Sequence, residues 1–276
     1  MILEHEIPTG SKLYFGASAK KKREIENIAS QVLFDEGFEE IVTPIFSYHQ
    51  HQSIADESEL VRVSDKENNM MSLRADSTID VVKIITKRVA RTTDQKKWFY
   101  VQPVFRAPSC ETYQVGAEFI NHSNLLDVLD VNMKIFNKLE LEPLLQLCNI
   151  KIPQIICEEL DLELDDFKLI KVDKFLSLGI EWLSDLVYLE TLEDLEKSLP
   201  KVPEKIRVEL EKLKDLASKV EYKNLVLSPL YYSKMLYYND VFYRVIEKNE
   251  IFARGGTYES DEITSVGFAI NTDTLI

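Results

Sequence analysis

The residue pattern of this chain changes sharply near residue 123 and changes back near residue 223, and this limits the possible folds more than any other feature. Outside these points, short segments with alternating apolar residues are typical of β-strands. Between them the chain is rich in Leu, Glu, Lys and Asp, with apolar residues at helical spacing. The sequence therefore predicts a core made of residues 1–122 and 224–276, with residues 123–223 as a helical insertion.

The N-terminal part of the core begins with an amphipathic helix. Apolar residues within 18–36 recur at the i, i+3, i+4 and i+7 positions of one helix face. Ser18 is the expected N-cap, and Gly37 is the expected stop. A short strand over residues 39–43 should follow and end at Pro44, because proline cannot donate to a sheet ladder.

A second helix and a hairpin are expected before the insertion. Residues 45–72 are polar and irregular, and a helix over about 77–91 follows them, capped by Asp76 or Ser77. Residues 97–105 and 111–120 then alternate as strands on either side of a polar loop, which predicts a long antiparallel hairpin.

Strands return after the insertion. They are expected over residues 225–230, 237–246, 251–253 and 264–271, with a hairpin tip at 247–250 and a permissive bend at Gly255–Gly256. The order of elements predicts an α+β fold, in which an antiparallel sheet is flanked by helices.

Composition excludes several classes of protein. The chain has 33 Lys+Arg against 47 Asp+Glu, a formal charge of −14, which argues against a protein that mainly holds tRNA. No apolar run approaches the roughly 18 residues that span a bilayer, and acids stand where a signal peptide would be basic, so the cytoplasm is the expected location. Three cysteines without paired spacing predict reduced thiols and no metal site.

Four short segments carry the chemistry that distinguishes this chain. The first, Leu73–Thr78, places Arg74 and Asp76 at the mouth of the second helix. Asp76 is alternatively a simple N-cap. The others are Val104–Glu118, Tyr237–Phe242, and Gly255–Tyr258 with Val266–Ile270.

The second segment suggests a ligand-binding sheet face. Arg106 ends a strand and can bind a phosphate bidentately. Gln114, Gly116 and Glu118 share one face of the next strand, because side chains alternate. Glycine weakens a strand interior, which favours close approach of a ligand over a solvent-facing polar edge. The tyrosines of the last two segments are alternatively core or sheet-face aromatics.

Together, these segments resemble the catalytic core of histidyl-tRNA synthetase, a class II aminoacyl-tRNA synthetase. They are similar to its LRPEGT-like stretch, its motif 2 (FR…QxGAE), its RGLDYYTG-like stretch, its GGRYD turn and the start of its motif 3. The resemblance covers residues 5–122 and 224–276 and implies the class II synthetase fold.

The resemblance also implies a site for histidine. Asp76 would hold the α-amino group of histidine, and Gln114 would contact the polar backbone atoms of that ligand. Arg106 would hold the ATP α-phosphate. The residues that would read the imidazole, through its two nitrogens, are Glu118, Tyr238 and Tyr258.

Other positions depart from the synthetase pattern and predict loss of catalysis. Ser233 and Thr274 stand where the family has arginines that stabilise adenylation, and Ala107 replaces the acid after the motif 2 arginine. Single preorganised donors are worth about 3–4 kcal/mol, so amino-acid activation should be lost and no residue should be catalytic. The chain ends shortly after motif 3, so no anticodon-binding domain is expected. Further departures are Asp240 for Gly, Thr257 for Arg and Glu259 for Asp.

A histidine pocket without synthetase chemistry is similar to one group, the regulatory subunits of ATP phosphoribosyltransferase. That enzyme carries out the first step of histidine biosynthesis. Membership implies a separate catalytic subunit as partner, a need for this chain in full activity, and feedback by L-histidine, with no cofactor. The motif 1 region, from Ser18 to Pro44, implies a homodimer.

Three alternatives remain open. A small class II ligase that activates an amino acid would need ATP and the missing arginines. A tRNA-binding accessory factor would need a basic surface. A structural paralogue would have no ligand at all.

Overall fold

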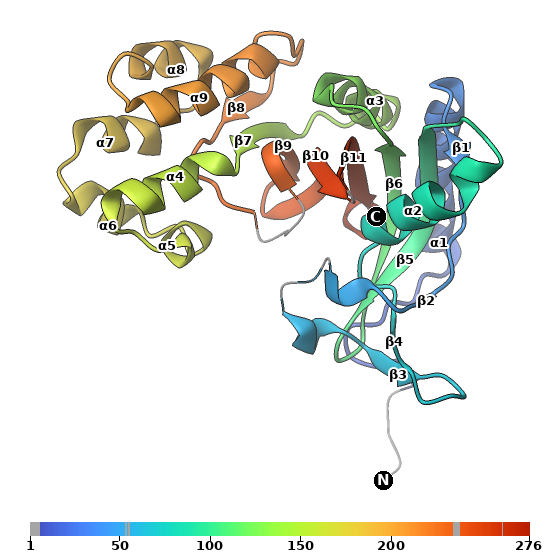
Figure 1. Ribbon diagram of the computed structural model, residues 1–276. Helices are drawn as coiled ribbons and strands as arrows, with labels where there is room; N and C mark the ends of the chain where they lie inside the picture. Colours follow the sequence, from blue (N-terminus) through green and yellow to red (C-terminus); the bar gives the residue numbers. More distant parts are fainter. Residues whose placement is uncertain (1–5, 53, 55, 234–237, 261) are drawn as a thin grey trace.

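The computed structural model describes residues 6–52, 54, 56–233, 238–260 and 262–276. Tyr237, expected to begin a strand, lies outside them, as does the start of the chain up to His5. Within the described residues, the main sheet has eight strands in the order β1-β5-β6-β11-β10-β9-β7-β8 (Figure 1). In that order they are Glu39–Glu40, Lys97–Arg106, Cys110–Phe119, Ile263–Asn271, Glu250–Ser260, Tyr238–Glu247, Leu144–Asn149 and Leu225–Leu227.

The main sheet is mixed. Its central pairs, from β5 to β7, are antiparallel, as predicted. The outer pairs, β1 with β5 and β7 with β8, are parallel. The predicted hairpin is confirmed, since Lys97 to Arg106 of β5 pair in register with Phe119 to Cys110 of β6. The expected fold, a sheet flanked by helices, is therefore confirmed, with parallel pairs at both edges.

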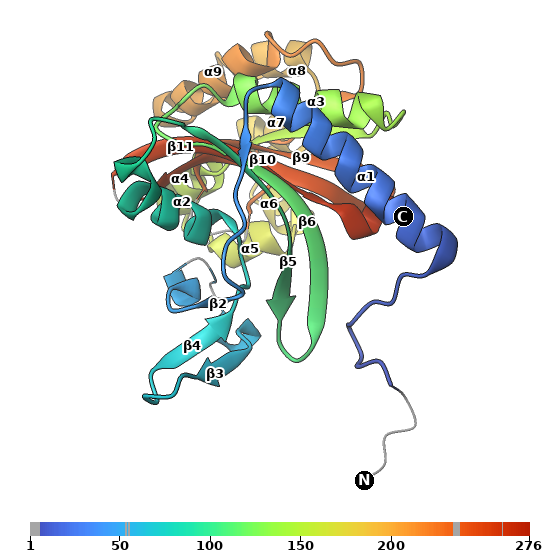
Figure 2. The same cartoon turned by 90° about the vertical axis from the view of Figure 1, so that its right-hand side faces the viewer.

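Helices α1 (Gly16–Asp35) and α3 (Leu125–Lys138) cover one face of the main sheet (Figure 2). The apolar stripe of α1, which includes Ala29 and Leu33, packs in one cluster with Phe99 of β5. The predicted N-cap was wrong: the helix begins at Gly16, and the Ser18 hydroxyl accepts a hydrogen bond from the Phe15 amide at 3.1 Å. Gly37 follows the helix with φ +80°, a conformation that favours glycine, so the predicted stop is confirmed.

Helix α2 (Thr78–Lys87), followed by the 3₁₀ turn Val89–Arg91, covers the opposite face. Its buried Val82 and Ile85 pack against Trp98 and Tyr100 of β5. Helices therefore lie on both faces of the sheet.

Residues 123–223 are not helical throughout. Strand β7 lies among them and pairs with β9. Its Leu145 and Leu147 are buried in the main sheet. One apolar cluster also runs from α1 into the helices after β7, so the core continues into this segment. These helices gather beyond β7 and β8 (Figure 1); they are α4 (Lys151–Leu160), α5 (Leu164–Lys168), α6 (Val172–Ser177), α7 (Glu181–Val187), α8 (Leu192–Ser198) and α9 (Glu204–Ala217). The division into core and insertion stays a prediction.

Two expectations about irregular segments were wrong. Residues 45–72 contain a small sheet of β2 (Phe46–Ser47), β4 (Met70–Leu73) and β3 (Arg62–Ser64), with 3₁₀ turns at Gln50–Gln52 and Glu57–Glu59. The predicted bend at Gly255–Gly256 is the middle of β10, which continues through it with a register shift against β9 between Gly256 and Tyr258. A Cβ on Gly255 would lie 2.4 Å from the Tyr243 ring, so the glycine accommodates an aromatic side chain. A 3₁₀ turn, Thr272–Leu275, follows β11.

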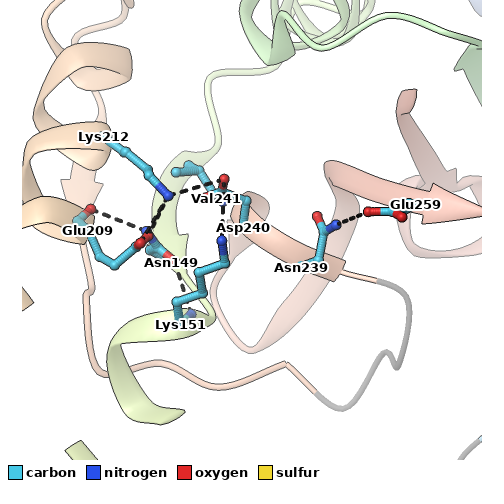
Figure 3. A network of polar contacts seen from close by, with 8 residues as sticks. All are labelled: Asn149, Lys151, Glu209, Lys212, Asn239, Asp240, Val241 and Glu259. Atoms are coloured by element: carbon cyan, nitrogen blue, oxygen red, sulfur yellow. Dashed lines mark hydrogen bonds and ion pairs between the residues drawn. The ribbon is translucent and has the colours of Figure 1, made fainter. Parts of the chain in front are cut away.

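A polar network joins the helical segment to β9 (Figure 3). Lys212 of α9 contacts Glu209 at 2.9 Å and Asp240 of β9 at 3.5 Å. Asn149, at the end of β7, donates to the Glu209 carboxylate at 2.9 Å. Asp240, a departure from the synthetase pattern, therefore serves as an acceptor for the helices; Lys151 of α4 also lies 4.0 Å from it.

Replacing Lys212 with Met should lower the free energy of unfolding by about 1 kcal/mol, because the lysine is partly exposed but the carboxylate of Glu209 is buried. Urea denaturation measures the change. Lys197→Met is the matched control, since Lys197 and its partner Glu193 are both exposed. An equal loss in both variants would contradict a specific role for the network.

Candidate functional site

A pocket on the α2 face of the main sheet brings the predicted ligand-binding residues together. All five residues proposed for histidine line it: Asp76, Gln114, Glu118, Tyr238 and Tyr258. They come from the start of α2 and from β6, β9 and β10. Thr78, the last residue of the first segment, also lines it, as do three side chains outside the four segments: Tyr100, Arg254 and Asn271.

Glu118 is the central acid of the pocket. Its side chain is fully buried, and the Tyr258 hydroxyl donates to Oε2 at 2.7 Å. Burial disfavours the charged carboxylate and raises the pKa of Glu118 to about 8, although the hydroxyls of Tyr258 and Thr78 oppose the shift. Oε1 has no hydrogen bond of normal geometry within the described residues. An N–H group of a ligand would supply the missing donor.

Two glycines leave room for the side chains around this acid. A Cβ on Gly267 would lie 2.0 Å from Glu118 Oε2, and a Cβ on Gly116 would lie 2.2 Å from the Tyr100 ring. Gly116 therefore accommodates Tyr100. The sequence-based reason, close approach of a ligand to Gly116, was wrong, because an aromatic ring of the protein covers that position.

Asp76 has two roles at the start of α2. Its Oδ1 accepts a long hydrogen bond from the Ile79 amide at 3.4 Å, as a helix cap does. Gln50 holds its backbone, because Oε1 accepts from the Asp76 amide at 2.6 Å and Nε2 donates to the Asp76 carbonyl at 3.0 Å. Asp76 therefore caps the helix and also lines the pocket, while its contact with a ligand stays a prediction.

Gln114 lies four residues before Glu118 along β6, on the same face of the strand. Its Nε2 donates to Asn271 Oδ1 of β11 at 3.3 Å. Gln114 and Glu118 of the polar row on β6 therefore line one pocket, and the alternative of a solvent-facing polar edge is wrong for the fully buried Glu118.

Arg106, the predicted phosphate ligand, is absent from the residues that line this pocket. Its Nε donates to the Ala75 carbonyl at 3.0 Å, and Nη1 pairs with Glu59. A phosphate at Arg106 would have to compete with that carboxylate, so this role stays a prediction. At the positions of the missing arginines, Ser233 is buried and the Thr274 hydroxyl donates to the Asn271 carbonyl at 2.7 Å.

Within the described part of the chain, no three His, Cys, Asp or Glu side chains gather closely enough to hold a metal ion. None of the helices described there is both long and apolar enough to cross a membrane.

Known proteins with similar sequences point to one family. Residues 14–171 match the family model described as histidyl-tRNA synthetase. The ATP phosphoribosyltransferase regulatory subunit of Wolinella succinogenes is 47% identical over 276 residues, which cover 100% of this chain and 96% of that protein. The protein of the same name from Helicobacter hepaticus is 41% identical, with 100% and 98% covered.

Solved structures agree on the fold. An ATP phosphoribosyltransferase regulatory subunit/histidyl-tRNA synthetase from Bacillus halodurans superposes with a TM-score of 0.84 at 17% identity, covering 100% of this chain and 83% of that one. A histidine–tRNA ligase subunit from Alicyclobacillus acidocaldarius gives a TM-score of 0.82 at 18% identity, with 100% and 97% covered. The fold is thus that of histidyl-tRNA synthetase, and the sequence shows that the chain belongs to the family of ATP phosphoribosyltransferase regulatory subunits.

Proposed function

We propose that this chain is a non-catalytic regulatory subunit that binds L-histidine in the pocket around Glu118 and transmits its presence to a separate catalytic ATP phosphoribosyltransferase subunit in the cytoplasm. The observation that carries the proposal is the convergence of all five predicted histidine ligands on one pocket. Feedback then follows if histidine binds one state of the assembly more tightly than the other, because the population shifts toward that state.

The chemistry of the pocket fits histidine in particular. The imidazole offers an N–H donor, and Glu118 Oε1 is a buried acceptor that lacks one. The carboxylate of Asp76 suits an ammonium group. Small or neutral side chains at Ser233 and Thr274 supply no cation for the phosphates of ATP, which supports sensing over amino-acid activation.

The assembly is part of the same proposal. The motif 1 region carries the exposed apolar side chains of Phe34 and Val42, and exposed Phe15, Ile45 and Phe46 flank it, which favours a homodimer through this surface. Size-exclusion chromatography with light scattering should show a dimer for the chain alone, and a larger species after the catalytic subunit of the same organism is added. A monomer at micromolar concentration would contradict the dimer.

The first test of ligand binding is calorimetric titration with L-histidine and then with ATP. Histidine should bind, and Glu118→Ala should weaken it at least about 100-fold, because the ligand loses a buried hydrogen-bond partner. The reconstituted enzyme should need this chain for full activity and lose activity when histidine is added. ATP binding with pyrophosphate exchange would instead indicate a ligase. Binding of neither ligand would indicate a structural paralogue.

A further inference from the structure

The pocket contains a cation that no sequence motif predicted. Arg254 of β10 lines the pocket together with Glu118 and Asp76, and it is the sole Lys or Arg among the described residues that do so. No ion pair or side-chain hydrogen bond joins it to another described residue, in contrast to Arg106, which pairs with Glu59.

A second arginine lies directly across the sheet from it. Arg254 pairs in register with Arg244 of β9, so the two side chains project from the same face with Cβ atoms about 4.5–5.5 Å apart. Arg244 donates to Gln146 Oε1 at 2.8 Å, and its guanidinium lies 3.5 Å from the Tyr231 ring centroid. Both of these partners are neutral.

Two like charges directly opposite one another destabilise a sheet unless an anion lies between or beside them. Within the described residues, no carboxylate pairs with either guanidinium. On its other side Arg254 pairs with Ala269, and Ala269 pairs with Gly116. Ala269 and Gly116 therefore place no long side chain directly beside Arg254, and Gln114 and Asn271 lie one pair further along the same face.

We propose that Arg254, reinforced by Arg244, is the anion subsite of this pocket and binds the carboxylate of its amino-acid ligand. This rests on the proposed histidine function. Arg254 and Tyr258 lie on the same face of β10, and Tyr258 contacts Glu118. A ligand whose imidazole meets Glu118 therefore directs its opposite end along β10 toward Arg254. The Arg254 guanidinium then binds the ligand carboxylate, from a position outside the synthetase motifs.

The test compares L-histidine with L-histidinol, which has an alcohol in place of the carboxylate, by calorimetry on the full chain. The wild-type protein should bind histidine about 10- to 100-fold more tightly than histidinol, because a charged hydrogen-bond pair is lost with the alcohol. Arg254→Gln should bind both ligands equally, at the wild-type affinity for histidinol. Arg254→Lys should retain part of the preference, since it keeps the charge without the fork.

Arg91→Gln is the matched control, because Arg91 is exposed outside the pocket and should behave as wild type. Thermal unfolding checks that each variant is folded. If Arg254→Gln keeps the full preference for histidine, the anion subsite is overturned while the proposed function stands.

A second probe covers the case in which the wild-type protein binds neither ligand, so that the proposed function fails. Inorganic phosphate is then added, and the NMR signal of the Arg254 Nε–H, assigned by its loss in Arg254→Gln, is followed. A saturable shift would sustain the anion subsite without histidine. An unchanged signal would overturn both.

Discussion

Replacing Glu118 with Gln should remove a large pH dependence from the stability of this protein. The folded-state pKa of Glu118 is about 8, well above the value of 4.5 for an exposed carboxyl. The folded protein therefore keeps this proton over a pH range in which the unfolded chain has released it. The contribution of Glu118 to stability is fully present below pH 4.5 and is lost as the pH rises through 8.

The size of this effect follows from the pKa difference. Each pKa unit corresponds to about 1.4 kcal/mol, so the wild-type protein should lose on the order of 3–5 kcal/mol between pH 4.5 and pH 9 through this group. Glutamine is neutral throughout, so Glu118→Gln should gain stability relative to wild type by that amount as the pH rises. Urea denaturation at several pH values from 5 to 9 measures the difference.

A matched control separates Glu118 from the many other acids. Glu211 on α9 is exposed, and Glu211→Gln should follow the wild-type curve at every pH. If Glu118→Gln keeps the same pH slope as wild type, then Glu118 is charged in the folded protein at neutral pH. In that case water must reach Glu118 Oε1, the oxygen without a hydrogen-bond partner among the described residues.

The sequence predicted the long strands well and the short ones poorly. Strands β5 and β6 each run for ten residues, so their alternating pattern is unmistakable. The strands of the small sheet have two to four residues, too few to show a period. Strand β7 was missed for a different reason: Leu145 and Leu147 lie on one face and Leu144 and Cys148 on the other, so its sequence does not alternate between apolar and polar residues.

The site could be predicted only where it matches synthetase motifs. The spacing of Gln114 and Glu118 on one strand placed both in the pocket, because alternation alone fixes their common face. Arg254 was missed because a bend expected at Gly255–Gly256 would have put it in a different element from Tyr258. Those glycines are instead part of one strand, and their lack of side chains serves the packing of neighbouring rings.

Arg74 belongs to a motif segment but has a structural role, which the sequence did not assign to it. It lies in the first of the four segments, yet it is 2% exposed, is not among the residues that line the pocket, and donates to the backbone of neighbouring segments. Its Nε donates to the Pro103 carbonyl at 2.9 Å. Its Nη1 donates to the carbonyls of Thr43 at 3.0 Å and Pro44 at 3.2 Å. Sequence alone cannot separate a guanidinium that binds phosphate from one that binds carbonyls.

Replacing Arg74 with Met should therefore lower the free energy of unfolding by about 3 kcal/mol or more, because three carbonyl groups lose their donor in a buried environment. Methionine retains much of the apolar volume, so the loss measures the hydrogen bonds and not a cavity. Arg74→Lys should lose about half as much, since one ammonium cannot reach all three carbonyls. Urea denaturation gives both values, and the exposed Arg88→Met should change stability by less than about 0.5 kcal/mol.

Loss of the Arg74 hydrogen bonds should also loosen the backbone of Ala75 and Asp76, beside the pocket. Arg74 stands two residues before Asp76, and the Arg74 carbonyl accepts from the Phe105 amide at 2.7 Å, which ties this segment to β5. In Arg74→Met, the amides of Ala75 and Asp76 should exchange faster with solvent hydrogen, while those in the centre of β6 stay protected. Uniformly faster exchange would mean that Arg74 supports the fold as a whole. An unchanged Asp76 amide would mean that Gln50 alone holds the start of α2, since it donates to and accepts from the Asp76 backbone.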